Sequence, residues 1–147
     1  MKSIAIIILF GLSLGSCNTS PQPIEYGNDG CHYCKMTIVD RQHASQLVTS
    51  KGKAYKFDAI ECMIGYLNEN KNDEYAHKLV SDFVEPGKLI DAQNATFLIS
   101  QDIPSPMGAF LSAFASEKAA VHVQSESGGN IYNWKSLQEF LKSEKPN

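Results

Sequence analysis

Two distant segments of the sequence share one pattern, and this repetition limits the possible folds more than any other feature. The segment YKFDAIECMI begins at Tyr55, and the segment YNWKSLQEFL begins at Tyr132. Each reads as an aromatic strand that leads directly into an amphipathic helix. The repetition predicts an α+β fold of two small, similar sheet-plus-helix halves, about 31–83 and 95–147. The alternative is that two unrelated strand–helix units simply share a common pattern.

Hydrophobic periodicity predicts the individual elements of both halves. The predicted strands are 36–39, 46–49, 54–57, 77–80, 95–100, 109–115 and 130–134. Helices are predicted after Asp58 and after Ser116, both suitable N-caps, and over 135–142. The stretch 103–108 contains two prolines that bracket one residue, so it is predicted to be irregular.

The N-terminal segment has the character of an export signal rather than of folded structure. A lysine at position 2 precedes a nearly all-apolar run of 11 residues over 4–14, which is too short to span a bilayer. The run ends in Leu-Gly-Ser-Cys17, which resembles the lipobox of bacterial lipoproteins. We therefore expect residues 1–16 to be a signal peptide and Cys17 to be lipidated. Residues 17–30 are polar and rich in Pro and Gly, which predicts a flexible tether to the membrane.

Composition and motifs exclude several classes of function. The net charge is −3, and no run of Lys and Arg is present, so no nucleic-acid partner is expected. The sequence contains no phosphate-binding loop, no paired-carboxylate signature, and no Ser-His-Asp arrangement in a recognisable context. We therefore do not expect an enzyme.

The most distinctive short motif is CHYCKM at positions 31–36, which places two thiols and a thioether within six residues. Two thiols at this spacing can cycle as a disulfide, bind zinc or hold a soft metal. A c-type haem site needs histidine where this chain has Lys35. Structural zinc usually takes four N or S ligands, and no second Cys-x-x-Cys exists. A thioredoxin-like motif would begin a helix, whereas strand-like residues follow here, but thiol–disulfide exchange stays as the alternative function.

Binding of a soft metal ion fits the motif better. Thiolate and thioether sulfurs together favour Cu(I). An extended backbone from Cys34 to Met36 would put both sulfurs on one face, and Cys31 could reach the same ion. The four cysteines less a lipidated Cys17 leave an odd number, which suits a metal site better than a set of disulfides.

For other residues the sequence gives less support for a role as metal ligand. Met107 lies between a proline and a glycine, where a ligand and a packing role are about equally reasonable. Cys62 is predicted to point away from the apolar face of its helix, as a structural or incidental thiol, although a place beside the metal stays open. His32, within the motif, is an optional imidazole donor, whereas His43, His77 and His122 have no distinctive spacing.

Residues 31–147 resemble the NosL family, which are lipoprotein copper chaperones for the assembly of nitrous-oxide reductase. The resemblance depends on CHYCKM at 31–36, FDAIECM at 57–63, SPMG at 105–108 and the following Ala-Phe at 113–114, together with the lipobox. It implies two ββαβ-like halves and a Cu(I) carrier. The implied ligands are Cys34 and Met36 first, then Cys31 and Met107. Family members commonly have glycine where this chain has Lys35, so the loop could be shaped differently.

The resemblance also implies a location and partners. The protein would be anchored in the cell envelope of a bacterium by lipid on Cys17, facing the periplasm. It would deliver Cu(I) to a copper enzyme, with nitrous-oxide reductase as the expected client, helped by a periplasmic assembly protein linked to an ABC transporter. The sequence does not decide between the inner and outer membrane, nor identify the client.

Overall fold

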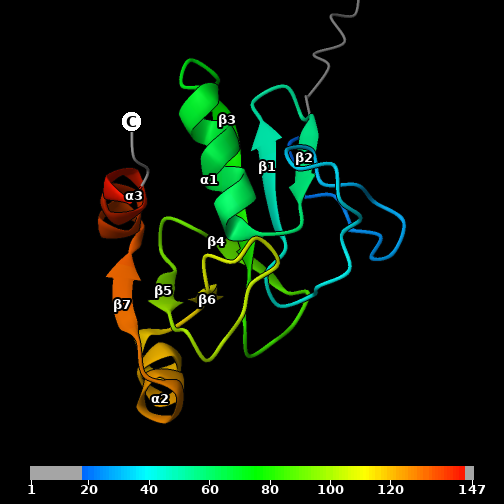
Figure 1. Ribbon diagram of the computed structural model, residues 1–147. Coiled ribbons are helices and arrows are strands. Elements are labelled where there is room, and N and C mark those ends of the chain that lie inside the picture. Colours follow the sequence, from blue (N-terminus) through cyan, green and yellow to red (C-terminus); the bar gives the residue numbers. More distant parts are fainter. Residues whose placement is uncertain (1–17, 145–147) are drawn as a thin grey trace, which may run out of the picture.

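The computed structural model describes residues 18–144 of the chain, so the predicted signal peptide and Cys17 lie outside the described residues. Within them the chain forms one four-stranded and one three-stranded antiparallel sheet with three helices (Figure 1). The elements in chain order are β1 (Ser45–Thr49), β2 (Ala54–Phe57), α1 (Ile60–Glu69), β3 (Tyr75–Ser81), β4 (Leu89–Asp91), β5 (Thr96–Ile99), β6 (Leu111–Phe114), α2 (Glu117–Ser127), β7 (Asn130–Asn133) and α3 (Trp134–Ser143). The predicted α+β fold is confirmed.

The two sheets repeat one topology. The first has the strand order β2-β1-β3-β4 and the second the order β6-β5-β7. In each, the first strand of the half lies between the second and the third, and a helix precedes the third. The units β1-β2-α1-β3 and β5-β6-α2-β7 therefore have the same ββαβ order, with β4 and α3 as additions. The expectation of two similar halves is confirmed.

The sequence repetition that suggested the duplication is out of register with it. The two matched segments are β2 with α1 and β7 with α3, whereas the topological counterpart of β2 and α1 is β6 with α2. The two matched segments are therefore two strand–helix units of similar pattern that occupy different places in their halves.

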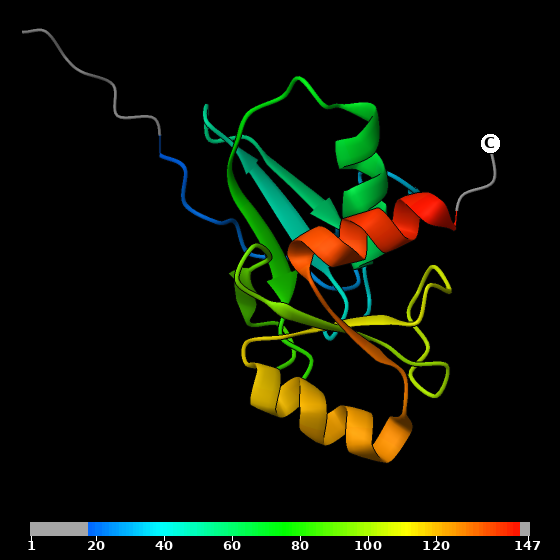
Figure 2. The same cartoon turned by 90° about the vertical axis from the view of Figure 1, so that its left-hand side faces the viewer.

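A continuous apolar core joins the two halves. It includes Leu47 of β1, Met63 of α1, Phe97 of β5 and Leu137 of α3, all fully buried. The second sheet is covered on both faces, with α3 on one side and α2 on the other (Figure 2). Side chains that alternate along β5 serve the two faces, because Phe97 joins the main core and Leu98 packs with the α2 side.

Two local predictions are corrected by the structure. The predicted strand 36–39 does not form, and Thr37 makes only an isolated bridge to Gly30. Helix α1 has Ala59 rather than Asp58 as its N-cap, without a side-chain cap. The cap at Ser116 is confirmed, since its side chain accepts a hydrogen bond from the Ala119 N–H. Strand β4 was not predicted.

Part of the segment 18–30, which composition predicts to be a flexible tether, contacts the domain. The Gln22 N–H donates to Gln46 Oε1, and Gln46 Nε2 donates to the Gln22 carbonyl, each at 2.8 Å. The pair satisfies the amide of a fully buried glutamine in β1. Tyr26 packs against the core and lies under the Arg41 guanidinium. The segment thereby fixes the entry to the CHYCKM loop.

Candidate metal centre

The CHYCKM motif folds into a closed loop rather than a strand. The Cys31 N–H donates to the Met36 carbonyl at 2.7 Å, and the Lys35 N–H donates to the Cys31 carbonyl at 3.1 Å. Lys35 has a φ of 67°, in the left-handed region. The predicted alternation of Cys34 and Met36 along an extended strand is therefore wrong. Lys35 thus adopts the kind of conformation that glycine takes readily, at the position where the family resemblance implies a glycine.

Two contacts hold the loop against β2 and α1. The His32 N–H donates to the Lys56 carbonyl in β2 at 2.8 Å. The Tyr33 ring lies directly on Gly65 of α1, where a Cβ would come within 2.9 Å of two ring carbons. Gly65 therefore permits the loop to approach the helix closely.

Four side chains converge where the loop meets the start of α1. The sulfurs of Cys31, Cys34 and Cys62 and a carboxylate oxygen of Asp58 all lie within 4.8 Å of one another. Cys31, Asp58 and Cys62 are at most 2% exposed, whereas Cys34 is half-buried. The Cys34 thiol donates to Asp58 Oδ1 at 3.3 Å. The centre is closed on its inner side and reaches the surface through Cys34.

Sequence reasoning missed Asp58 as a member of this centre and left Cys62 at its margin. Asp58 was assigned to the N-cap, but the cap falls one residue later, and its carboxylate turns to the thiols instead. Cys62 is buried in the first turn of α1, not turned away from the core. The signal that could have found them is the Asp-x-x-x-Cys spacing just before and within one helical turn.

The three thiols have separated acidities. The neighbouring Cys62 thiol lowers the pKa of Cys31 to about 6, backed by the N–H groups of Asp58 and Cys34 and opposed by burial. Burial is the main cause that raises the pKa of Cys34 to about 11. The pKa of Cys62 is raised by its contact with Cys31 and by burial. Cys31 is thus the thiolate of the group, held between two protonated thiols at neutral pH.

The donor set suits a soft metal ion. Three sulfurs and one carboxylate oxygen can surround a single ion, and thiolates select Cu(I) and Zn²⁺ over hard cations. Backbone N–H groups also serve the sulfurs, from Cys34 to Cys31 and from Met36 to Cys34. Such hydrogen bonds stabilise thiolate charge, so the loop is prepared for ligation.

The two predicted methionine ligands lie at the surface. Met36 is 54% exposed at the end of the CHYCKM loop. Met107 is 43% exposed on the loop between β5 and β6, where it lines a cavity of about 210 Å³ with residues of α1, among them Glu61 and Gly65. The structure therefore unites Cys31 and Cys34 in one group and places Met107 on a second loop against the same helix.

Two of the histidines considered as donors have other surroundings. The His32 ring packs at a tilt against Tyr55, with centroids 4.5 Å apart, and edge-on against Tyr66. Its pKa is lowered by burial and by nearby lysines. His122 is exposed on α2, near Glu126.

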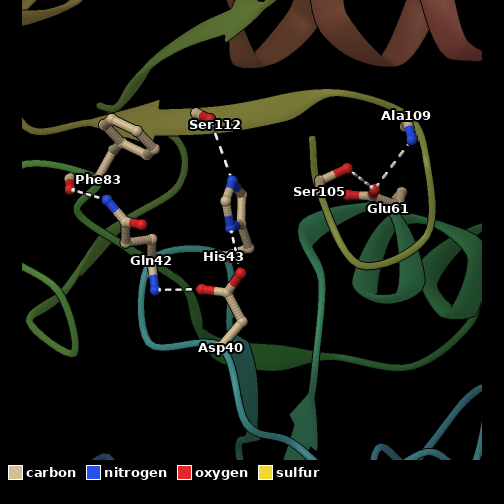
Figure 3. A network of polar contacts seen from close by, with 8 residues as sticks. All are labelled: Asp40, Gln42, His43, Glu61, Phe83, Ser105, Ala109 and Ser112. Atoms are coloured by element: carbon tan, nitrogen blue, oxygen red, sulfur yellow. Dashed lines mark hydrogen bonds and ion pairs between the residues drawn. The ribbon is translucent and has the colours of Figure 1, made fainter. Parts of the chain in front are cut away.

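A separate polar network connects the two halves (Figure 3). His43 Nδ1 lies 2.8 Å from Asp40 Oδ2, and His43 Nε2 lies 3.2 Å from the Ser112 hydroxyl in β6. The order of groups is that of a catalytic triad, which the sequence did not reveal. His43 and Ser112 are both buried, however, and Phe83 packs edge-on against the imidazole. A nucleophile with no access to solvent cannot meet a substrate, so the network serves to tie the halves together.

Fold and centre together define a small α+β protein with a thiol-rich group that could hold a metal ion. The family model for NosL matches residues 23–141, and the chain belongs to the NosL family. The resemblance seen in the sequence is thereby confirmed.

Known relatives agree with this assignment. The chain is 27% identical over 154 aligned residues to the copper-binding lipoprotein NosL of Stutzerimonas stutzeri, covering 96% of this chain and 81% of the relative. Its fold matches the crystal structure of the copper chaperone NosL from Shewanella denitrificans with a TM-score of 0.69 at 21% identity, covering 80% of this chain and 95% of the other. Among the residues that the structure describes, no helix has the length and apolar character to cross a bilayer.

Proposed function

We propose that this protein is a Cu(I) chaperone of the bacterial cell envelope. Cys34 and Cys31 supply thiolates, Met36 supplies a thioether from the same loop, and Met107 approaches from the second loop. The cargo is copper for a periplasmic enzyme, with nitrous-oxide reductase as the favoured client and a periplasmic, ABC-transporter-linked protein as assembly partner. Lipid on Cys17 holds the chaperone at the membrane.

The observation that carries this proposal is the convergence of three thiols and Asp58 behind a partly open edge. A chaperone must hold its ion firmly and still let a recipient's ligand enter. The inner thiols, Cys31 and Cys62, are buried, whereas Cys34 and the exposed Met36 lie toward solvent. Ligand exchange can therefore begin at the outer edge while the inner thiolate keeps hold of the ion.

The same geometry weighs against a thiol–disulfide exchange protein. A nucleophilic cysteine needs an accessible thiol of low pKa, often at a helix N-terminus. Here the accessible thiol is Cys34, whose pKa is raised by burial to about 11. The thiol of low pKa is Cys31, which is 1% exposed. Cys31, Cys34 and Cys62, the cysteines among the described residues, are free thiols.

A competition titration against a Cu(I) chelator tests the function. Reduced protein should bind one Cu(I) per chain, and Cys34→Ser should lose tight binding. Met36→Leu should keep the fold, because the volume is similar, and bind more weakly. Met63→Leu is the matched control, since Met63 is a fully buried core residue, and its affinity should stay at the wild-type value. Wild-type affinity in Cys34→Ser would refute the proposed site.

A further inference from the structure

The loop that carries Met107 is shaped to present its tip. Two residues have positive φ, Gly108 at 76° and Phe110 at 56°. The Gly108 N–H donates to the Ser105 carbonyl at 3.0 Å, which closes a turn around the methionine. Ser105 is buried beneath this turn while Met107 is largely exposed.

One carboxylate oxygen fixes both sides of this turn. Glu61 Oε1 accepts from the Ser105 hydroxyl at 2.5 Å and from the Ala109 N–H at 3.3 Å (Figure 3). Ser105 and Ala109 lie two residues before and two residues after Met107. Hydrogen bonds to a charged acceptor are stronger than neutral ones, and here they bracket the methionine from both sides. The other oxygen, Oε2, is buried without a hydrogen-bond partner among the described residues.

The same helical turn that holds this loop also belongs to the thiol centre. Glu61 immediately precedes Cys62, whose sulfur lies with those of Cys31 and Cys34. The carboxylate is therefore a direct polar connection between the Met107 turn and the helix that carries Cys62.

We propose that Glu61 is the positioning residue for Met107. It holds the turn that carries Met107 beside the first turn of α1, so that the thioether can bind copper at the thiol centre. The inference rests on the proposed function, in which Met107 is a donor. Glu61 does not itself touch copper in this scheme. It keeps Met107 from ranging over the many orientations of a free loop, so the entropic penalty of recruiting the thioether is lowered.

The test is a double-mutant cycle read by Cu(I) affinity. Glu61→Ala should weaken binding as much as Met107→Leu, by about tenfold, which is the lower end for residues that orient metal ligands. The double variant should be no weaker than either single variant, because the thioether is already lost to the site. Glu61→Gln keeps an oxygen acceptor and should stay within about twofold of wild type. Glu139→Ala, an exposed acidic residue on α3, is the matched control and should have wild-type affinity.

A copper-free measurement separates this proposal from the proposed function. Amide hydrogen exchange at Ala109 should speed up in Glu61→Ala and stay slow in Glu61→Gln. If Glu61→Ala does not fold, Ser105→Ala takes its place, since it removes one of the two contacts. Wild-type affinity in both Glu61→Ala and Ser105→Ala, or additive losses in the double variant, would overturn the positioning role. Cys34→Ser in the same titration tests the proposed function, because unchanged Cu(I) affinity in this variant would refute the proposed copper site itself.

Discussion

The Cys34 sulfur donates a hydrogen bond to the Asp58 carboxylate across 3.3 Å, and this contact joins the motif loop to the start of α1. An N-cap role would have turned this carboxylate toward the helix. Because the helix begins one residue later, the carboxylate instead faces three thiols. Burial is the main cause that raises the pKa of Cys34, and this contact adds to it, so the proton stays on Cys34 in the metal-free protein and the negative charge on Cys31.

Replacing Asp58 by asparagine should lower the pKa of the Cys34 thiol. Burial is the largest cause that raises that pKa to about 11, and the contact with Asp58 adds to it. The expected change is a shift to lower pH by less than about one unit, since burial stays the same. Thiolate absorbance near 240 nm during a pH titration of reduced, metal-free protein measures it. An upper transition that does not move in Asp58→Asn would show that the carboxylate has no influence on the thiol.

Stability should follow the Cys31 thiolate. Its pKa is lowered from the ordinary range to about 6, so the folded protein binds fewer protons than the unfolded chain between about pH 6 and 9. Stability therefore rises with pH through this window, by at most about 1.4 kcal/mol per pH unit, and the contribution is lost as pH falls through 6. Above pH 9 the raised pKa values of Cys34 and Cys62 reverse the sign, so stability falls as pH rises further. Urea unfolding of reduced wild type and Cys31→Ala at several pH values checks this, and equal slopes below pH 9 would contradict it.

Lys35→Gly should stabilise the fold by about 1 kcal/mol, because a lysine at positive φ bears a steric penalty that glycine avoids. Its side chain donates to the His32 carbonyl at the surface, and losing that contact subtracts little. Lys56→Gly in β2 should instead destabilise, because a glycine weakens a strand and the ion pair of Lys56 with Asp29 is lost. Urea denaturation of both variants measures the change in stability. A loss of stability in Lys35→Gly would contradict a steric penalty at the positive φ of Lys35.

The sequence was sufficient for the architecture and for half of the centre. Periodicity located most elements, and composition separated the irregular 103–108 stretch from its flanking strands. The motif identified Cys31 and Cys34. It could not identify Asp58, because a one-residue shift of the helix start decides whether that carboxylate caps α1 or faces the thiols. Such shifts depend on tertiary packing, which local pattern does not record.

The error in the repeat has a similar physical origin. An aromatic strand followed by an amphipathic helix satisfies the same burial requirement wherever it occurs, so β7 with α3 resembles β2 with α1 in sequence while occupying a different place. The left-handed turn at Lys35 was equally hidden, because the residue type favours other conformations and the surrounding hydrogen bonds impose this one.

Gly65→Ala should displace the motif loop. The added Cβ would lie 2.9 Å from the Tyr33 ring, so the fold should lose about 1–3 kcal/mol and Cu(I) affinity should fall. In a Tyr33→Ala background the obstruction is gone, and the same substitution should stabilise the helix by up to about 1 kcal/mol. Thermal unfolding of the four proteins of this cycle gives the sign in each background. If Gly65→Ala destabilises the protein in both the wild-type and the Tyr33→Ala background, a contact other than the Tyr33 ring requires glycine at this position.

Cys17 should carry lipid in cells. The lipobox-like sequence after the apolar run motivates this expectation, and several acyl chains bind a membrane far more firmly than one. Wild type should incorporate labelled palmitate and sediment with membranes, whereas Cys17→Ser should do neither. A Ser16→Ala variant, which keeps a small residue before the cysteine, should be labelled as the wild type is. Unlabelled wild-type protein would contradict the assignment.

Copper binding should release a number of protons that reveals which thiols ligate. At pH 7.5 Cys31 is mostly thiolate, since its pKa is near 6, while Cys34 is protonated, since its pKa is near 11. Ligation of Cu(I) by these two sulfurs alone should therefore release about one proton, and about two at pH 5. Affinity should rise about tenfold per pH unit near neutrality. Calorimetry in buffers of different ionisation enthalpy counts the protons.

Met36→Leu should change the affinity and leave this count unaltered, because a thioether carries no proton. A release of two protons at pH 7.5 would mean that Cys62 also ligates or that Cys31 is not a thiolate. Thiolate absorbance of the metal-free wild type at the same pH distinguishes the two, because it is present in the first case and absent in the second.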